Sequence, residues 1–174
     1  MIQGERVRLR PIEQADLAAL EAEANDVDAQ GFYNMFGLRR SNTFESSFNE
    51  HGFLSDHYGM LRIVTHDGAA IGSVTYHQVA YGPNSASRIY NFGINIAAAQ
   101  RGQGYGTEAQ RLLADYLLAT YPIMRVEAST DISNIPEQRA LEKAGFTREG
   151  VLRRAQWRAG EWHDLVVYSK LRGE

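Results

Sequence analysis

The fold of this chain is decided by one stretch, Gln100-Arg101-Gly102-Gln103-Gly104-Tyr105-Gly106-Thr107-Glu108-Ala109. It lies between a run typical of a strand, Arg88 to Ile96, and an amphipathic run typical of a helix. Glycines allow the backbone to approach a ligand closely, and the free N–H groups at the start of a helix bind anions. Arg101 adds a positive charge and Thr107 a hydroxyl group. The stretch therefore predicts a site for a phosphate or pyrophosphate group.

Two common phosphate-binding motifs do not match this loop. A P-loop carries Lys followed by Ser or Thr after its last glycine, and no such pair is present. A dinucleotide-binding fingerprint needs a third glycine at a longer spacing than that of Gly102, Gly104 and Gly106. Glycines ahead of a helix can also form a simple tight turn, so the loop alone leaves that alternative open.

The hydrophobic periodicity on either side of the loop predicts a mixed α/β domain. The expected strands are 7–10, 60–65, 70–81, 88–96, 123–130, 151–158 and 162–171, and the expected helices are 13–23, 44–54, a helix from about 109 that Pro122 ends, and 134–144. His66-Asp67-Gly68-Ala69 is a hairpin turn, and Thr43 is the expected cap of its helix. The strand-helix-strand crossover predicts that strands 88–96 and 123–130 are parallel. Glu108, in the first turn of its helix, is expected to interact with the helix dipole.

The composition is that of an ordinary globular protein, with 174 residues, 44% of them hydrophobic and 22% charged. We expect one domain over residues 1–174. The chain has no cysteine, which excludes a disulfide framework, a cysteine-ligated metal and an acyl-cysteine intermediate. A net charge of −3 provides no overall attraction to nucleic acid or to an anionic membrane. No apolar run approaches the ~20 residues that cross a bilayer, so we expect a cytoplasmic protein with no membrane or nucleic-acid partner.

The glycine loop belongs to a wider pattern. Arg101-x-x-Gly104-x-Gly106 is followed, after the predicted crossover, by Asn134 and then by Glu142-Lys143-x-Gly145-Phe146. This pattern resembles the GNAT superfamily of acyl-CoA-dependent N-acyltransferases, and within it the RimJ/RimL-like branch that acetylates α-amino groups of proteins and various small amines. The similarity extends over nearly the whole chain, to Gly4-Glu5-Arg6-Val7-Arg8-Leu9-Arg10-Pro11, Ala70-Ile71-Gly72, Asp164 and Tyr168-Ser169-Lys170-Leu171.

The resemblance implies a single GNAT-like domain of the α/β (α+β) class. Its sheet would be mixed and mostly antiparallel, with helices on both faces. The sheet would splay between strands 88–96 and 123–130, and the acyl-CoA would lie in the opening. The expected partners are an acyl-CoA and an amine acceptor, and the protein is expected to be a monomer or a homodimer.

The resemblance also implies which residues hold acetyl-CoA, or another acyl-CoA, as co-substrate, with no metal. Loop amides would grip the pyrophosphate, backbone groups near Ile94 and Ile96 would pair with the pantetheine arm, and Asn134 would contact that arm from the opposite wall. The implied set is Ile94, Ile96, Arg101, Gly102, Gln103, Gly104, Tyr105, Gly106, Thr107, Asn134, Arg139 and Lys143.

Acyl transfer to an amine needs a neutral nitrogen, a donor for the developing oxyanion and a proton for the departing thiolate. Where relatives often carry Ser three residues after the asparagine, this chain has Glu137, a candidate acid or base at the thioester. Alternatively, Asn134 and Glu137 form a capping box, which we favour because the helix needs a cap in any case. The catalytic candidates are Asn134, Glu137 and Glu127, although Arg125 could simply pair with Glu127.

The acceptor amine is expected to meet aromatic side chains in the irregular segment near the N-terminus. Tyr33 and Phe36 are the candidates there, and Tyr76 on a middle strand is a third. A satellite hydrophobic cluster that covers the sheet edge is the alternative for the first two. The same two interpretations, acceptor contact or hydrophobic packing, apply to Trp157 and Trp162 of the last hairpin.

Three functions remain open from the sequence. The first is an acyl-CoA-dependent N-acyltransferase, most simply an acetyltransferase, in which a primary amine attacks directly in a ternary complex because no cysteine can hold the acyl group. The second is a GNAT-fold transferase that takes its acyl group from an aminoacyl-tRNA or a carrier protein. The third is a non-catalytic acyl-CoA-binding module.

Overall fold

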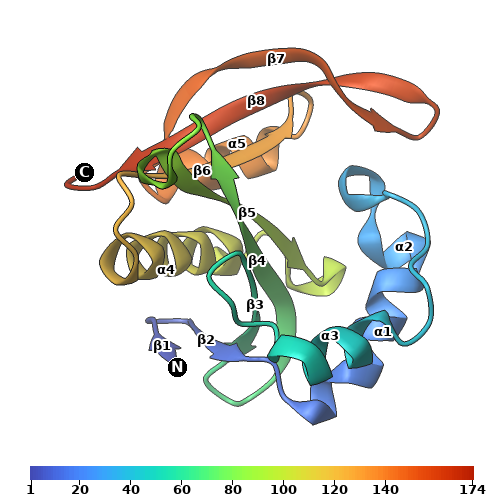
Figure 1. Cartoon of the computed structure of the whole chain (residues 1–174). Helices are drawn as coiled ribbons and strands as arrows, with labels where there is room; N and C mark the ends of the chain where they lie inside the picture. The colour runs from blue at the N-terminus through green and yellow to red at the C-terminus, as the bar shows by residue number, and fades with distance from the viewer.

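An eight-stranded mixed sheet forms the centre of the computed structural model, which describes all 174 residues (Figure 1). The strand order is β1-β2-β3-β4-β5-β6-β8-β7, and only β5 and β6 pair in parallel. The strands are β1 Ile2–Gln3, β2 Val7–Pro11, β3 Tyr58–Thr65, β4 Ala70–Ala80, β5 Arg88–Ile96, β6 Arg125–Asp131, β7 Thr147–Arg158 and β8 Glu161–Leu171. The α-helices are α1 Leu17–Asn25, α2 Val27–Gln30, α3 Thr43–His51, α4 Tyr105–Thr120 and α5 Ile135–Lys143. The predicted mixed, mostly antiparallel sheet with helices on both faces is confirmed.

Local turn chemistry explains the antiparallel part of the sheet. The β3–β4 hairpin closes at Gly68, whose φ of 92° is easy for glycine and strained for other residues. The Asp67 carboxylate accepts from the Ala69 amide at 3.5 Å and also bonds the Thr65 hydroxyl. β4 continues into β5 with nine paired residues, from Gly72↔Ile96 to Ala80↔Arg88. The sequence prediction of a meander through these three strands is confirmed.

The main hydrophobic core lies between the sheet and α4. Ala109, Leu113 and Leu117 recur along one face of this helix and are fully buried. They belong to the same core cluster as Val7 and Leu9, which alternate along β2 toward the helix. This packing fixes the start of α4, and with it the glycine loop, against the middle of the sheet.

The segment between β2 and β3 covers the other face of the sheet. A second cluster, Ile12, Leu17, Leu20, Phe44, Phe53 and Met60, joins α1 and α3 to β3. Arg62 of β3 is buried and donates to both carboxylate oxygens of Glu23 in α1, at 2.9 and 2.6 Å. The ion pair holds α1 close to the sheet. The short helix α2 that follows lies near the loop after β5, where Arg101 donates to the Ala29 carbonyl at 3.5 Å.

The parallel pair β5 and β6 splays apart. Its register runs only from Tyr90↔Val126 to Phe92↔Ala128. Beyond that point β5 remains paired with β4 up to Ile96, while β6 remains paired with β8 up to Asp131. The backbone edges of 93–96 and 129–131 therefore face each other without pairing, as the resemblance implied.

Several local predictions need correction. The helix expected over 13–23 begins only at Leu17, after a 3-10 turn. The helix expected over 44–54 is α3, which ends at His51. Thr43 is not a cap, because it lies inside α3 and its hydroxyl donates to the Arg40 carbonyl at 2.5 Å, while Asn42 precedes the helix with φ 64°. Glu108 does more than interact with the helix dipole, since its carboxylate accepts from the Glu5 amide and from the Arg6 amide at 3.0 Å. No helix is both long and apolar enough to cross a membrane.

Candidate active site

The splay opens into a cavity of about 680 Å³. One wall is β5 from Asn91 to Ile96, and the other is β6 from Ala128 to Asp131 with the start of α5. The glycine loop closes one end, and residues 30–36 together with the β7–β8 hairpin close the other. The cavity therefore joins the predicted phosphate site to the predicted acceptor segment.

The glycine loop has free donors. Gly102 and Gly104 have φ values of 76° and 83°, which place them in the left-handed region that glycine adopts at little cost. Gly104 caps α4 without a side-chain hydrogen bond, and the first intrahelical amide bond of the loop runs from Glu108 to the Gly104 carbonyl. The amides of Tyr105, Gly106 and Thr107 thus remain available for an anion.

Basic side chains surround this end of the cavity. Arg101 is exposed, and its Nε donates to the Ile96 carbonyl at 2.8 Å, which fixes the guanidinium between β5 and Gly31. Arg139 and Lys143 line the cavity from α5. The free amides and three cations suit a diphosphate, so the residues present fit the pyrophosphate of an acyl-CoA.

Gln103 and Tyr105 contribute to the loop in a different way. They do not line the cavity with their side chains. The Gln103 side chain donates to Gln100 Oε1 at 3.2 Å, and both residues border a separate surface depression beside Arg6. Only their backbone groups remain on the path of a ligand.

Asn134 caps α5, but the predicted capping box is only half formed. The Asn134 side-chain oxygen accepts from the Glu137 amide at 3.4 Å, and its nitrogen donates to Thr130 Oγ1 at 2.9 Å. The Asn134 amide donates to the Asp131 carbonyl instead of to the Glu137 carboxylate. The favoured interpretation of Glu137 as a capping residue is therefore wrong.

The Glu137 side chain lines the cavity instead. Burial raises its pKa to about 7. A carboxyl with such a pKa is about half protonated at neutral pH. It can therefore give a proton as well as take one.

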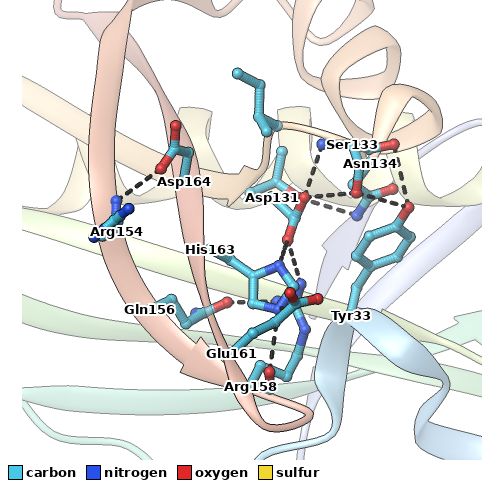
Figure 2. A network of polar contacts seen from close by, with 12 residues as sticks. Tyr33, Asp131, Ser133, Asn134, Arg154, Gln156, Arg158, Glu161, His163 and Asp164 are labelled. Atoms are coloured by element: carbon cyan, nitrogen blue, oxygen red, sulfur yellow. Dashed lines mark hydrogen bonds and ion pairs between the residues drawn. The ribbon is translucent and has the colours of Figure 1, made fainter.

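The opposite end of the cavity contains a buried polar cluster around Asp131 (Figure 2). Its carboxylate pairs with the guanidinium of Arg158, which is 2% exposed, and lies 3.0 Å from His163 Nδ1. It also accepts from the Ser133 amide and hydroxyl at 2.7 and 2.6 Å. Burial alone would raise the pKa of Asp131, but the bonds from Ser133 and Arg158 outweigh it and lower that pKa.

Aromatic side chains from the segment after α2 cover this cluster. The rings of Phe32 and Tyr33 lie 4.8 and 5.6 Å from the Arg158 guanidinium carbon. The Tyr33 hydroxyl donates to the Ser133 carbonyl at 3.2 Å, so the segment bridges to the loop after β6 (Figure 2). Phe36 also lines the cavity. The structure thus brings Tyr33 and Phe36 to the cavity, as the sequence predicted.

Two predicted site residues lie elsewhere. Tyr76 is 1% exposed in the main core, edge-on to Tyr90 at 5.3 Å, because its side chain points to the face of the sheet that α4 covers. Glu127 does not line the cavity. Its carboxylate pairs with Arg125 at 2.5 Å and accepts from the Tyr81 hydroxyl at 2.8 Å, so it is already neutralised. We therefore withdraw Tyr76 as an acceptor contact and Glu127 as a catalytic group.

Trp157 and Trp162 form a cross-strand pair near the tip of the last hairpin, with ring centroids 5.5 Å apart. Both are more than half exposed and neither lines the cavity. Their neighbours Gln156 and Arg158 point to the other face and do line it. The alternation of the strand therefore separates the two tryptophans from the cavity.

Several cavity residues were missed from the sequence, namely Phe32, Asp131, Gln156 and Arg158. His77 was considered as a middle-strand residue but was interpreted as a packing or surface group, and it lines the cavity. Asp131 and Arg158 are 27 positions apart and come together only through the pairing of β6, β8 and β7. One signal was available at the position where β6 ends, because Asp131 follows directly on an alternating strand. A polar group at a strand end beside a splay is a reasonable candidate for a site.

Comparison with known proteins decides the family. The model of the acetyltransferase (GNAT) domain matches residues 6–147. The chain belongs to the GNAT acetyltransferase family. The probable N-acetyltransferase YjcK of Bacillus subtilis is 29% identical over 98% of this chain and 97% of its own length. As a member of this family the chain is an N-acetyltransferase.

Solved GNAT structures share the whole fold. Spermidine N-acetyltransferase from Vibrio cholerae, solved with CoA and spermine, superposes with a TM-score of 0.81 at 20% identity and covers 95% of each chain. RimJ from Mycobacterium smegmatis, solved with CoA-disulfide, gives a TM-score of 0.76 at 23% identity over 95% of this chain and 81% of its own. At this level of identity the likeness shows the fold. The GNAT fold class predicted from the sequence is confirmed.

Proposed function

We propose that this GNAT domain transfers an acetyl group from acetyl-CoA directly to a primary amine, and that Glu137 delivers the proton to the departing thiolate. The observation that carries the proposal is a partly buried carboxyl with a pKa of about 7 in the cavity between β5 and β6. The acceptor is a protein N-terminal α-amino group or a small-molecule amine.

The donor end of the cavity fits acetyl-CoA. Loop amides of 103–107 with Arg101 would hold the pyrophosphate, and Arg139 and Lys143 would lie toward the nucleotide. Unpaired backbone groups of β5 around Ile94 would meet the pantetheine arm, and one of them would donate to the developing oxyanion. Asn134, held by Thr130, would contact the arm from the α5 side.

Direct attack is supported by the lack of an activated nucleophile. The chain has no cysteine. His77 lines the cavity, but no serine or threonine hydroxyl is hydrogen-bonded to it, so it activates no nucleophile. The amine nitrogen itself would therefore form the new bond to the acyl carbon.

Glu137 would supply the proton that the departing sulfur needs. When the amine nitrogen bonds to the acyl carbon, the carbon–sulfur bond breaks and the sulfur takes the proton of the Glu137 carboxyl. Transfer from a group of pKa about 7 to a thiolate whose conjugate pKa is ~8.5 is downhill. The nitrogen releases one proton to solvent, and Glu137 regains one from it.

The charges at the acceptor end bear on the choice of amine. Asp131 is the carboxylate there, and it is already paired with Arg158 and His163. A polyamine would need uncompensated carboxylates for its additional charges. This arrangement supports a monoamine or a peptide N-terminus over a polyamine such as the spermine bound by the Vibrio cholerae enzyme.

A thiol-release assay with acetyl-CoA over a panel of amines tests the proposal. The panel contains short peptides with free N-termini, monoamines and spermidine. We expect acetylated product, intersecting initial-rate lines and no acyl group on the protein by mass spectrometry. Parallel lines together with an acylated protein would overturn direct transfer.

A further inference from the structure

The guanidinium of Arg158 is buried at the acceptor end of the cavity and held by hydrogen bonds. Its Nη1 donates to Gln156 Oε1 at 2.6 Å, and its Nη2 donates to the Asp131 carboxylate. Arg158 belongs to the cavity lining, yet it is only 2% exposed. A buried ion pair gives little net stability, because the cost of desolvation offsets the attraction between the charges. The presence of this pair beside the acceptor path therefore calls for a functional explanation.

Two aromatic rings lie against this guanidinium. The ring centroids of Phe32 and Tyr33 are 4.8 and 5.6 Å from its central carbon. Aromatic rings attract a cation, and a planar guanidinium that is hydrogen-bonded at its edges can still stack with its faces. The Tyr33 hydroxyl also donates to the Ser133 carbonyl at 3.2 Å (Figure 2). Arg158 and Ser133 thus hold the short turn after α2 at two points.

The same two rings, which we name the aromatic wall, contribute an apolar surface to the cavity. Both Phe32 and Tyr33 line the acceptor end, and so does Phe36. Phe32 is 46% exposed and Phe36 is 60% exposed, so neither ring is used up by packing within the protein. Exposed apolar side chains that gather in a cavity are typical of a surface that a ligand covers.

The charge beside the aromatic wall is already compensated. The Asp131 carboxylate pairs with Arg158, accepts from the Ser133 amide and hydroxyl, and lies 3.0 Å from His163 Nδ1. These contacts use the roughly four positions at which a carboxylate accepts hydrogen bonds. A second ammonium group on the acceptor would find no free carboxylate here, whereas an apolar group would find the exposed rings.

We propose that Arg158 is a positioning residue that holds Phe32 and Tyr33 in place as the aromatic wall, and that this wall selects a primary amine with an apolar neighbouring group. The inference rests on the proposed acetyl transfer to a primary amine. The apolar group can belong to a small arylalkylamine or to the first side chain of a peptide, since both would present the same surface to the rings.

Two matched pairs of acceptors test the selection in a thiol-release assay with acetyl-CoA. One pair is 2-phenylethylamine and ethanolamine, and the other is a tripeptide that begins with phenylalanine and one that begins with serine. The amines within a pair have similar basicity, so the pair isolates the apolar group. We expect kcat/KM to be roughly 10- to 100-fold higher for the aromatic member of one pair, and that pair identifies the source.

Arg158→Lys tests the positioning role. Lys keeps a positive charge for Asp131 but lacks the planar group against which the rings pack. We expect KM for the aromatic acceptor to rise about 3- to 10-fold, while kcat and CoA affinity stay the same. Phe32→Ala removes a half-exposed ring, leaves the ion pair intact and should raise the same KM. Trp157→Ala, which removes an exposed ring outside the cavity, is the matched control and should change neither value.

The outcomes separate this inference from the proposed function. Equal kcat/KM values within both pairs, or an aromatic preference that Phe32→Ala leaves unchanged, would overturn the aromatic wall while acetyl transfer stands. A preference that Phe32→Ala reduces but a folded Arg158→Lys variant retains would overturn the positioning role of Arg158. If no amine of either pair is acetylated, the proposed function fails and the inference fails with it.

Discussion

Replacement of Glu137 by Gln should weaken the pH dependence of the unfolding free energy. Relative to the intact protein, the variant should be more stable at pH 8 than at pH 5. Burial raises the pKa of this carboxyl to about 7 from an ordinary value of 4.5. The folded protein therefore binds the proton more tightly than the unfolded chain. The favourable contribution is complete below pH 4.5 and is lost as the pH rises through 7. A shift of this size corresponds to about 3 kcal/mol of unfolding free energy, lost mainly between pH 4.5 and 7.

Urea unfolding at pH 5 and pH 8 measures this effect. The intact protein and Glu137→Gln share all other titrating groups, so the difference between their pH dependences isolates Glu137. We expect the unfolding free energy of the intact protein to fall by about 2 to 3 kcal/mol more than that of the variant. Glu142→Gln, an exposed carboxylate on the same helix, is the matched control. Parallel pH dependences for the intact protein and Glu137→Gln would refute the account of a carboxyl protonated by burial.

Three further perturbations test the rest of the site. Arg101→Ala should weaken CoA binding roughly 10- to 100-fold in calorimetry, the loss of one charge-assisted contact, and unchanged affinity in a folded variant would remove the pyrophosphate assignment. Gly104→Val should weaken CoA binding more than this, because a β-branched residue is strained at φ 83° and its side chain enters the ligand's space; an equal or smaller loss would contradict that geometry. Asp131→Asn leaves Arg158 buried without its counter-ion. It should lower the unfolding free energy measured in urea by about 3 to 5 kcal/mol. A loss below about 1 kcal/mol would contradict a buried ion pair.

The sequence predicted those parts of the fold that depend on local chemistry. The Asp67-Gly68 turn, the alternation of β4 and β5, and the stripe of α4 each follow from short-range rules, and the structure has them. The start of α3 was misjudged because Asn42, not Thr43, has the left-handed backbone that ends the preceding loop.

The parts that failed depend on long-range packing. The side chains of β4 alternate between the two faces of the sheet, and the packing of the whole sheet decides which face α4 covers. Tyr76 lies on the face that α4 covers. Glu127 accepts a hydrogen bond from Tyr81, which lies 46 positions away. Glu137 matched the capping-box spacing, yet its side chain lines the cavity and the Asn134 amide donates to the Asp131 carbonyl instead.

The most direct test of direct acetyl transfer assisted by Glu137 is kcat with acetyl-CoA and a reactive amine for the intact protein, Glu137→Gln and Glu137→Ser. Glu137→Gln keeps the shape of the side chain but cannot give a proton. It should therefore lower kcat by roughly 100-fold or more while CoA affinity stays the same. Glu137→Ser should retain part of the activity if a hydroxyl or a water can serve the departing sulfur. A folded Glu137→Gln enzyme with kcat within a few-fold of the intact protein would contradict the account.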